Sequence, residues 1–206
     1  MDAPIRQAVD SADTNAPRPP AAVSALPGDA GFWTFIAADA ILFALLFFQF
    51  SLDRSHHAQV FDAGRGELVI TLGAVNTLVL VTSSWLVARG VRSASLGDID
   101  STLRWITGTV SLGGVFAVLK ITEYVLEIRF GHAPSTSTFF MYYFMITGIH
   151  LVHLLAGVIA LSAISLRLRS APNYGRNRVF LECGASYWHL VDLLWMFIFP
   201  LLYLAR

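Results

Sequence analysis

Residues 181–205, LECGASYWHLVDLLWMFIFPLLYLA, form an apolar stretch that nevertheless contains three ionisable side chains. A helix that crosses a bilayer needs about 20 mostly apolar residues, and this stretch is long enough. It contains Glu182, His189 and Asp192. An unpaired charge near the bilayer centre costs about 2.5–3.5 kcal/mol on insertion scales. We therefore expect these side chains to pair inside a bundle and to hold this helix against the preceding helix and its partners.

The composition of the whole chain is that of a membrane protein. Of its 206 residues, 55% are apolar and 14% are charged, and the mean hydropathy is +0.61. The formal net charge is zero, and no basic face or nucleic-acid motif is present, which argues against nucleic-acid binding. Four further stretches are long and apolar enough to cross a bilayer, at about 31–51, 68–88, 105–126 and 138–166. We predict an all-α polytopic membrane protein, a bundle of five transmembrane helices.

The first 30 residues differ from the rest of the chain. They are rich in Pro, Ala, Asp and Ser and contain no apolar run that a fold could bury. This composition predicts that residues 1–30 form a disordered tail and that residues 31–206 form the membrane domain. The next apolar stretch is full length and contains Asp39, so we expect a retained anchor rather than a cleaved signal peptide.

Arginines are unevenly distributed between the two sides of the predicted bundle. The tail and the predicted loops at 89–104 and 167–180 contain Arg6, Arg18, Arg89, Arg92, Arg104, Arg167, Arg169, Arg176 and Arg178. The opposite loops and the C-terminus contain Arg54, Arg65, Arg129 and Arg206. The positive-inside rule therefore places the N-terminus in the cytoplasm and, after an odd number of crossings, the C-terminus outside.

Charged residues and histidines occur within all but one of the predicted helices. They are Asp39, Lys120, Glu123, Glu182, Asp192, His150, His153 and His189. Two pairs are three residues apart on one helix, Lys120 with Glu123 and His189 with Asp192, and side chains at this spacing can touch. We expect these eight residues to form a structural or protonic polar network, with no catalytic residue among them.

Asp39 has no ionisable neighbour within four residues on its own helix. It is therefore expected either to find a partner on another helix or to stay protonated. A proton-relay role and an inert structural role are both open for such a carboxyl group. Glu182 lies near the start of its helix, where it can face lipid headgroups.

His150 and His153 lie on one face of the predicted fourth helix, and Gly157 continues the same stripe. Imidazole is a ligand for haem iron and other metals. Axial ligands approach a haem from opposite faces, however, which two residues one turn apart cannot do. We therefore favour hydrogen bonds across a close helix contact that Gly157 permits, and we expect no metal site on this chain. Cys183 is the only cysteine, which excludes an intramolecular disulfide and a CxxCH haem attachment.

Five further residues are expected to pack the helices together. Amide side chains form hydrogen bonds between transmembrane helices, glycines let backbones approach, and the large aromatic rings fill the contact. These residues are Asn76, Gly113, Gly157, Trp188 and Trp195.

Five motifs occur in the order in which they are found in subunit III of haem-copper oxidases. ECGASYWHLVDLLWMFIFPLLY (182–203) resembles the last helix of that family, and FFMYYFMITGIHLVHLLAGV (139–158) resembles the helix before it. The earlier helices are matched by KITEY (120–124), VNTLVLVTSS (75–84) and FIAADAILFALLFF (35–48). The details are most similar to the short five-helix members that accompany bacterial nitric oxide reductases.

The resemblance covers about 31–204 and implies a subunit without a catalytic centre, docked against the catalytic subunit of a respiratory haem-copper oxidase or nitric oxide reductase. It implies that haem and copper or iron are bound by that partner and not by this chain. It also implies roles in assembly, lipid packing and proton uptake during electron transport in the bacterial inner membrane. The chain has Asp39 where mitochondrial-type members have Glu, and Lys120 where oxygen-reducing members commonly have an uncharged polar residue. The first two helices of the seven-helix members are missing.

Two alternatives remain open at the level of sequence. One is a self-contained haem b electron carrier that uses His150, His153 or His189. The other is a proton-coupled transporter centred on Asp39.

Overall fold

The computed structural model describes residues 28–170 and 174–204 of the chain. The predicted disordered tail lies outside these residues, apart from its last three positions. Within the described ranges, all regular secondary structure is helical. This confirms the all-α prediction.

Five helices are long and apolar enough to cross a membrane, which confirms the prediction of five crossings. The last one is extended by a π-helical turn, Pro200–Leu204. In chain order the long helices are α1 (Ala30–His56), α3 (Ile70–Ser95), α4 (Ile99–Arg129), α5 (Thr138–Ser170) and α6 (Tyr174–Phe199).

The helices extend beyond the apolar runs, so the predicted loop at 89–104 is mostly helical. The reason is that hydropathy marks only the part of a helix inside hydrocarbon, whereas a helix continues until its backbone groups are capped. The α3–α4 connection is short because Gly97 adopts a positive φ of 82°. The Asp98 carboxylate then caps α4 by accepting the Ser101 N–H at 2.9 Å.

A short helix, α2 (Ala58–Glu67), occupies most of the segment 52–67, which we predicted to be a loop. Ten residues without an apolar run give no spanning signal, so the sequence pattern did not reveal it. Its Phe61 is buried, with ring centroids 5.1 Å from Phe50 and 6.0 Å from Phe139. These aromatic contacts fix α2 across the end of the bundle.

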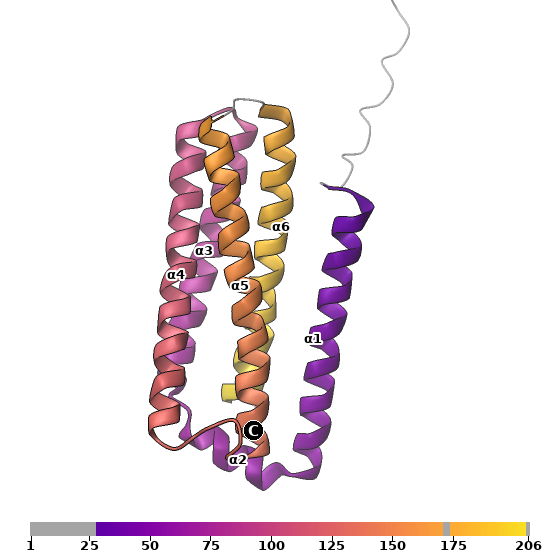
Figure 1. Ribbon diagram of the computed structural model, residues 1–206, viewed down its shortest axis with the longest axis vertical. Coiled ribbons are helices and arrows are strands. Elements are labelled where there is room, and N and C mark those ends of the chain that lie inside the picture. Colours follow the sequence, from indigo (N-terminus) through magenta and orange to yellow (C-terminus); the bar gives the residue numbers. More distant parts are fainter. Residues whose placement is uncertain (1–27, 171–173, 205–206) are drawn as a thin grey trace, which may run out of the picture.

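Helices α3, α4, α5 and α6 form a closed ring, and α1 lies beside it (Figure 1). Within the ring, α3 packs against α4 and α6, and α5 packs against the same two helices. Helix α1 contacts α2, α5 and α6. The start of α1 and the α3–α4 turn lie at one end of the structure, and α2 lies at the other. The arginine-rich segments 89–104 and 167–170 belong to the first of these ends.

Trp188 of α6 is the centre of the helix packing. Its indole is fully buried, and its Nε1 donates a hydrogen bond to Ser83 Oγ of α3 at 3.0 Å. A Cβ added to Gly113 of α4 would lie 2.6 Å from Trp188 Cη2, and one added to Gly157 of α5 would lie 2.9 Å from Cε3. Helices α3, α4 and α5 therefore all approach the Trp188 indole, and on α4 and α5 the approach is so close that only glycine fits.

We expect Gly113→Ala to lower the unfolding free energy by about 1–3 kcal/mol, because the new methyl group overlaps the Trp188 indole. Gly114→Ala is the matched control, since no atom lies within 4 Å of its added Cβ. The measurement is the thermal unfolding midpoint of each variant in detergent. Equal losses in both variants would show that the Trp188 contact does not decide the result, because the higher helix propensity of alanine would stabilise both.

Candidate functional site

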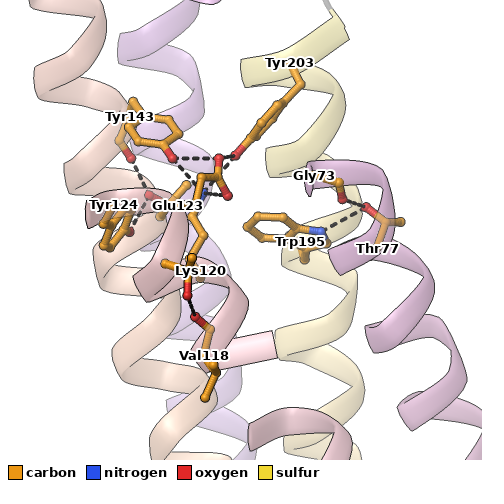
Figure 2. A network of polar contacts seen from close by, with 11 residues as sticks. Gly73, Thr77, Val118, Lys120, Glu123, Tyr124, Tyr143, Trp195 and Tyr203 are labelled. Carbon is orange, nitrogen blue, oxygen red and sulfur yellow. Dashed lines mark hydrogen bonds and ion pairs between the residues drawn. The ribbon is translucent and has the colours of Figure 1, made fainter. Parts of the chain in front are cut away.

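A buried ion pair lies in the interior of the ring, toward the end that carries the π-helical turn (Figure 2). Lys120 Nζ of α4 is 3.2 Å from Glu123 Oε2, one turn further along the same helix. Both side chains are almost completely buried. The contact expected from the i,i+3 spacing of Lys120 and Glu123 is therefore present.

Two tyrosines from other helices complete this pair. Lys120 Nζ donates to the hydroxyl of Tyr143 of α5 at 3.1 Å and to that of Tyr203 at 2.8 Å. These hydroxyls in turn donate to Glu123 Oε1 at 2.8 and 2.5 Å, respectively. An ammonium has three N–H donors, and each has an acceptor here. We call these four residues the Lys120 cluster.

Aromatic rings surround the ammonium of the Lys120 cluster. Lys120 Nζ lies 4.5 Å from the ring centroid of Tyr143 and 5.4 Å from that of Trp195. The negative faces of such rings attract a cation, most strongly where water is excluded. Removing a charge from water is expensive, and a buried pair is stable only when every donor and acceptor is satisfied. The cluster meets this requirement.

Trp195 of α6 connects the Lys120 cluster with the rest of the interior. Its Nε1 donates to Thr77 Oγ1 of α3 at 3.0 Å, and Thr77 donates to the Gly73 carbonyl at 2.8 Å, as Figure 2 shows. Its ring centroid lies 4.8 Å from Phe116 of α4 and 5.3 Å from His150 of α5. One side chain thus contacts three other helices of the ring.

Asp39 joins α1 to the ring. Its Oδ1 lies 2.8 Å from His153 Nε2 of α5, so the partner is on another helix. His153 Nδ1 lies 2.7 Å from the Ile149 carbonyl, which can only accept, so Nδ1 carries a hydrogen. The other contact is then either imidazolium with carboxylate or neutral imidazole with carboxylic acid. Both forms hold one proton between the two side chains, and both are neutral overall.

His150 lies one turn before His153 on α5 but points elsewhere. It is fully buried, with its ring centroid 5.7 Å from Phe116 and 5.3 Å from Trp195. Among the described residues neither of its nitrogens has a hydrogen-bond partner. The two histidines therefore do not act together: His150 faces the core of the ring, and His153 faces α1.

Two of the three ionisable residues of the opening stretch have partners, while the buried carboxyl group of Asp192 has no hydrogen-bond partner among the described residues. His189 Nδ1 is 2.7 Å from Ser84 Oγ of α3, so the expected pair with Asp192 does not form. Glu182 pairs with Arg178 of its own helix at 2.8 Å. Of this set only His189 holds the last helix to another helix, and that helix is α3 rather than the preceding α5. An i,i+3 spacing permits a contact but does not require it, and His189 contacts Ser84 instead.

Asn76 differs from its expected role as well. It is fully buried on α3, yet its amide has no hydrogen-bond partner among the described residues. The hydrogen bonds that α3 makes to α6 come instead from Thr77, Ser83 and Ser84. Across the described ranges, no three His, Cys, Asp or Glu side chains gather closely enough to hold a metal ion.

Comparison with known sequences gives the family. The sequence model of the family described as cytochrome c oxidase subunit III matches residues 23–205. The chain belongs to this family. The resemblance deduced from the five motifs is thereby confirmed, while membership of the nitric-oxide-reductase-associated subset stays a prediction.

Individual subunit III proteins are similar over most of their length. The chain is 27% identical to subunit 3 of the cytochrome bo(3) ubiquinol oxidase of Pseudomonas aeruginosa, over 84% of this chain and 83% of that protein. It is 28% identical to the quinol oxidase subunit 3 of Bacillus subtilis, over 84% and 85%. It is 27% identical to the cytochrome c oxidase subunit 3 of Thermostichus vulcanus, again over 84% and 85%.

Two ionisable residues of this subunit III chain were not part of the predicted network. Glu127 is buried one turn beyond Glu123, and its Oε2 lies 2.8 Å from His132 Nδ1. His132 stacks on Phe140 with centroids 4.5 Å apart and borders an open surface pocket. Glu127 was missed because the predicted helix ended at 126. The spacing 120, 123, 127 on one helix face was the signal that would have revealed it.

We expect Lys120→Met to lower the unfolding free energy by about 3–5 kcal/mol, because it leaves Glu123 buried with no positive partner. The double variant Lys120→Met/Glu123→Gln should lose less than the single variant, since it removes the uncompensated charge. Denaturant unfolding in mixed micelles, followed by circular dichroism, measures both. A double variant less stable than Lys120→Met would contradict the assignment of a true ion pair.

We expect Asp39→Leu to loosen α1 and Asp39→Asn to leave it in place, because an amide can still donate to His153 Nε2. The measurement is the distance distribution between spin labels at the exposed positions 45 on α1 and 193 on α6, with Cys183 replaced by Ser. The leucine variant should broaden the distribution, and the asparagine variant should not. Broadening by both variants would show that the charged form of Asp39 is required.

Proposed function

We propose that this chain is the non-catalytic subunit of a respiratory haem-copper terminal oxidase or nitric oxide reductase in a bacterial inner membrane. The observation that carries this proposal is the family match over residues 23–205, across all the spanning helices. The named relatives are subunits of ubiquinol, quinol and cytochrome c oxidases. The partner is then the catalytic subunit of such a complex, together with the surrounding lipids.

The interior of the ring supports the view that haem and metal ions are bound by the partner. Lys120 and Glu123 are satisfied by each other and by two tyrosines. Both nitrogens of His153 are engaged, and the ring of His150 is enclosed by Phe116 and Trp195. These contacts favour a structural subunit over the alternative of a haem b electron carrier.

A row of ionisable groups supports a protonic contribution to the partner's turnover. It begins at the Lys120 cluster, continues through Glu127 on the same face of α4 and reaches the surface at His132. Buried ionisable residues in membrane proteins commonly mark proton pathways. We propose that this row supports proton movement at the end of the bundle that the positive-inside rule places outside the cytoplasm.

The nitric-oxide-reductase-associated subset is part of the same proposal. What supports it is the set of sequence details noted above, above all the lysine that precedes Glu-Tyr in KITEY (120–124). Lys120 is fully buried in the interior, so this difference from the oxygen-reducing members concerns the core and not the surface.

We expect affinity purification of the chain from its native membrane in a mild detergent to recover a larger haem protein. The visible haem spectrum should belong to that partner, whose identity separates oxygen chemistry from nitric oxide chemistry. The chain purified without the partner should be colourless.

Two other outcomes would assign a different function. A coloured isolated chain whose haem is lost on replacing His150 or His189 would make it an electron carrier. Proton flux by the chain alone in liposomes, abolished in Asp39→Asn, would make it a transporter.

A further inference from the structure

Arg89 of α3 is held between two tryptophans on the outer surface of the ring. Its guanidinium carbon lies 5.4 Å from the ring centroid of Trp85 and 5.3 Å from that of Trp105 of α4. The two indoles meet edge to face, with centroids 5.8 Å apart and an interplanar angle of 81°. Arg89 is exposed, and so is Trp85. The guanidinium is thus oriented by two rings while remaining accessible from outside.

The positive charge of Arg89 is not neutralised by the described part of the chain. None of the ion pairs or hydrogen bonds within these residues involves Arg89. A nearby acid at the same end, Asp98, is engaged in capping α4. Arg104, also exposed and next to Trp105 in the sequence, donates to the Ser101 hydroxyl at 2.9 Å and interacts electrostatically with the Asp98 carboxylate.

Arg89 directly follows the apolar run 68–88 that is expected to cross the bilayer, which favours a position at the edge of the hydrocarbon region. It lies six residues before the end of the helix at Ser95, about 9 Å at a rise of about 1.5 Å per residue. Tryptophans are enriched at this depth in membrane proteins, and long basic side chains extend toward it. This position suits a contact between the guanidinium and the phosphate groups of lipids.

An apolar stripe continues from this position toward the middle of the membrane. Trp85, Val81 and Leu78 follow Arg89 at successive turns of one helix face and are 55%, 48% and 68% exposed. These side chains can contact an acyl chain over the same length of helix that carries the guanidinium at its end. The guanidinium and the apolar stripe are thus spaced to match the phosphate group and the acyl chain of a phospholipid.

We propose that Trp85, Arg89 and Trp105 form a binding site for the phosphate group of an anionic phospholipid. A guanidinium presents planar N–H donors that match phosphate oxygens, and the indoles hold it in one orientation. Basic sites between transmembrane helices on the cytoplasmic side are known to select anionic headgroups. The site requires a membrane but no partner subunit, so it goes beyond the accessory role proposed above and its failure would leave that role untouched.

The test is native mass spectrometry of the full chain with phosphatidylglycerol and with phosphatidylcholine of the same acyl chains. The wild type should bind phosphatidylglycerol more tightly. Arg89→Gln should reduce that affinity about fivefold and leave phosphatidylcholine binding unchanged, because one interfacial cation is lost. Trp105→Leu should reduce it as well, since the guanidinium then loses one of its two supports.

Arg167→Gln is the matched control. Arg167 is an exposed arginine at the same end of the bundle, and its guanidinium lies 6.0 Å from the single ring of Phe180. Phosphatidylglycerol affinity should survive this change. An equal loss in Arg167→Gln would overturn the proposal in favour of a general positive field. Displacement of the lipid by inorganic phosphate would overturn it in favour of a free-phosphate site, and release of the catalytic subunit by Arg89→Gln in favour of a protein contact.

Discussion

The charge of Lys120 is the constraint that organises the interior of the ring. Once an ammonium is enclosed away from water, all three of its donors need acceptors, and the single carboxylate of Glu123 does not suffice. The remaining acceptors come from Tyr143 on α5 and Tyr203 after α6. The hydrogen bonds of one residue on α4 thereby determine how two other helices approach it. Nearer the opposite end of the ring, the close contacts of glycines with Trp188 determine the approach of the helices through steric fit.

Helix α1 is attached to the rest of the molecule in a different way. Its polar links to α5 are the Asp39–His153 contact and a short hydrogen bond from the Tyr142 hydroxyl to Asp53, near α2. Phe43 and Phe50 of α1 add buried aromatic contacts with α5, but α1 contacts its neighbours over a smaller area than the ring helices contact one another, so it separates more easily. The ring and α1 are therefore expected to respond differently to the loss of a single side chain.

The five long helices could be predicted because each crossing needs an apolar run of known length. The Lys120–Glu123 contact also followed from spacing on one helix. Contacts between helices could not be derived in this way: His189 contacts Ser84 rather than Asp192, and the partner of Asp39 is on α5. Helix α2 and the buried position of Glu127 were missed because both lie where the apolar pattern stops. Hydrophobic periodicity describes each helix separately, whereas the polar contacts join different helices.

Lys120 is the only lysine of the chain, and the fold encloses it completely. The described surface therefore presents its positive charge through arginine and histidine alone and offers no side-chain primary amine to the solvent. Chemistry that needs such an amine, whether acylation by a reagent or attachment of a modifying group, requires the ring to open first. Reactivity at this single atom is thus a direct chemical measure of how often the bundle comes apart.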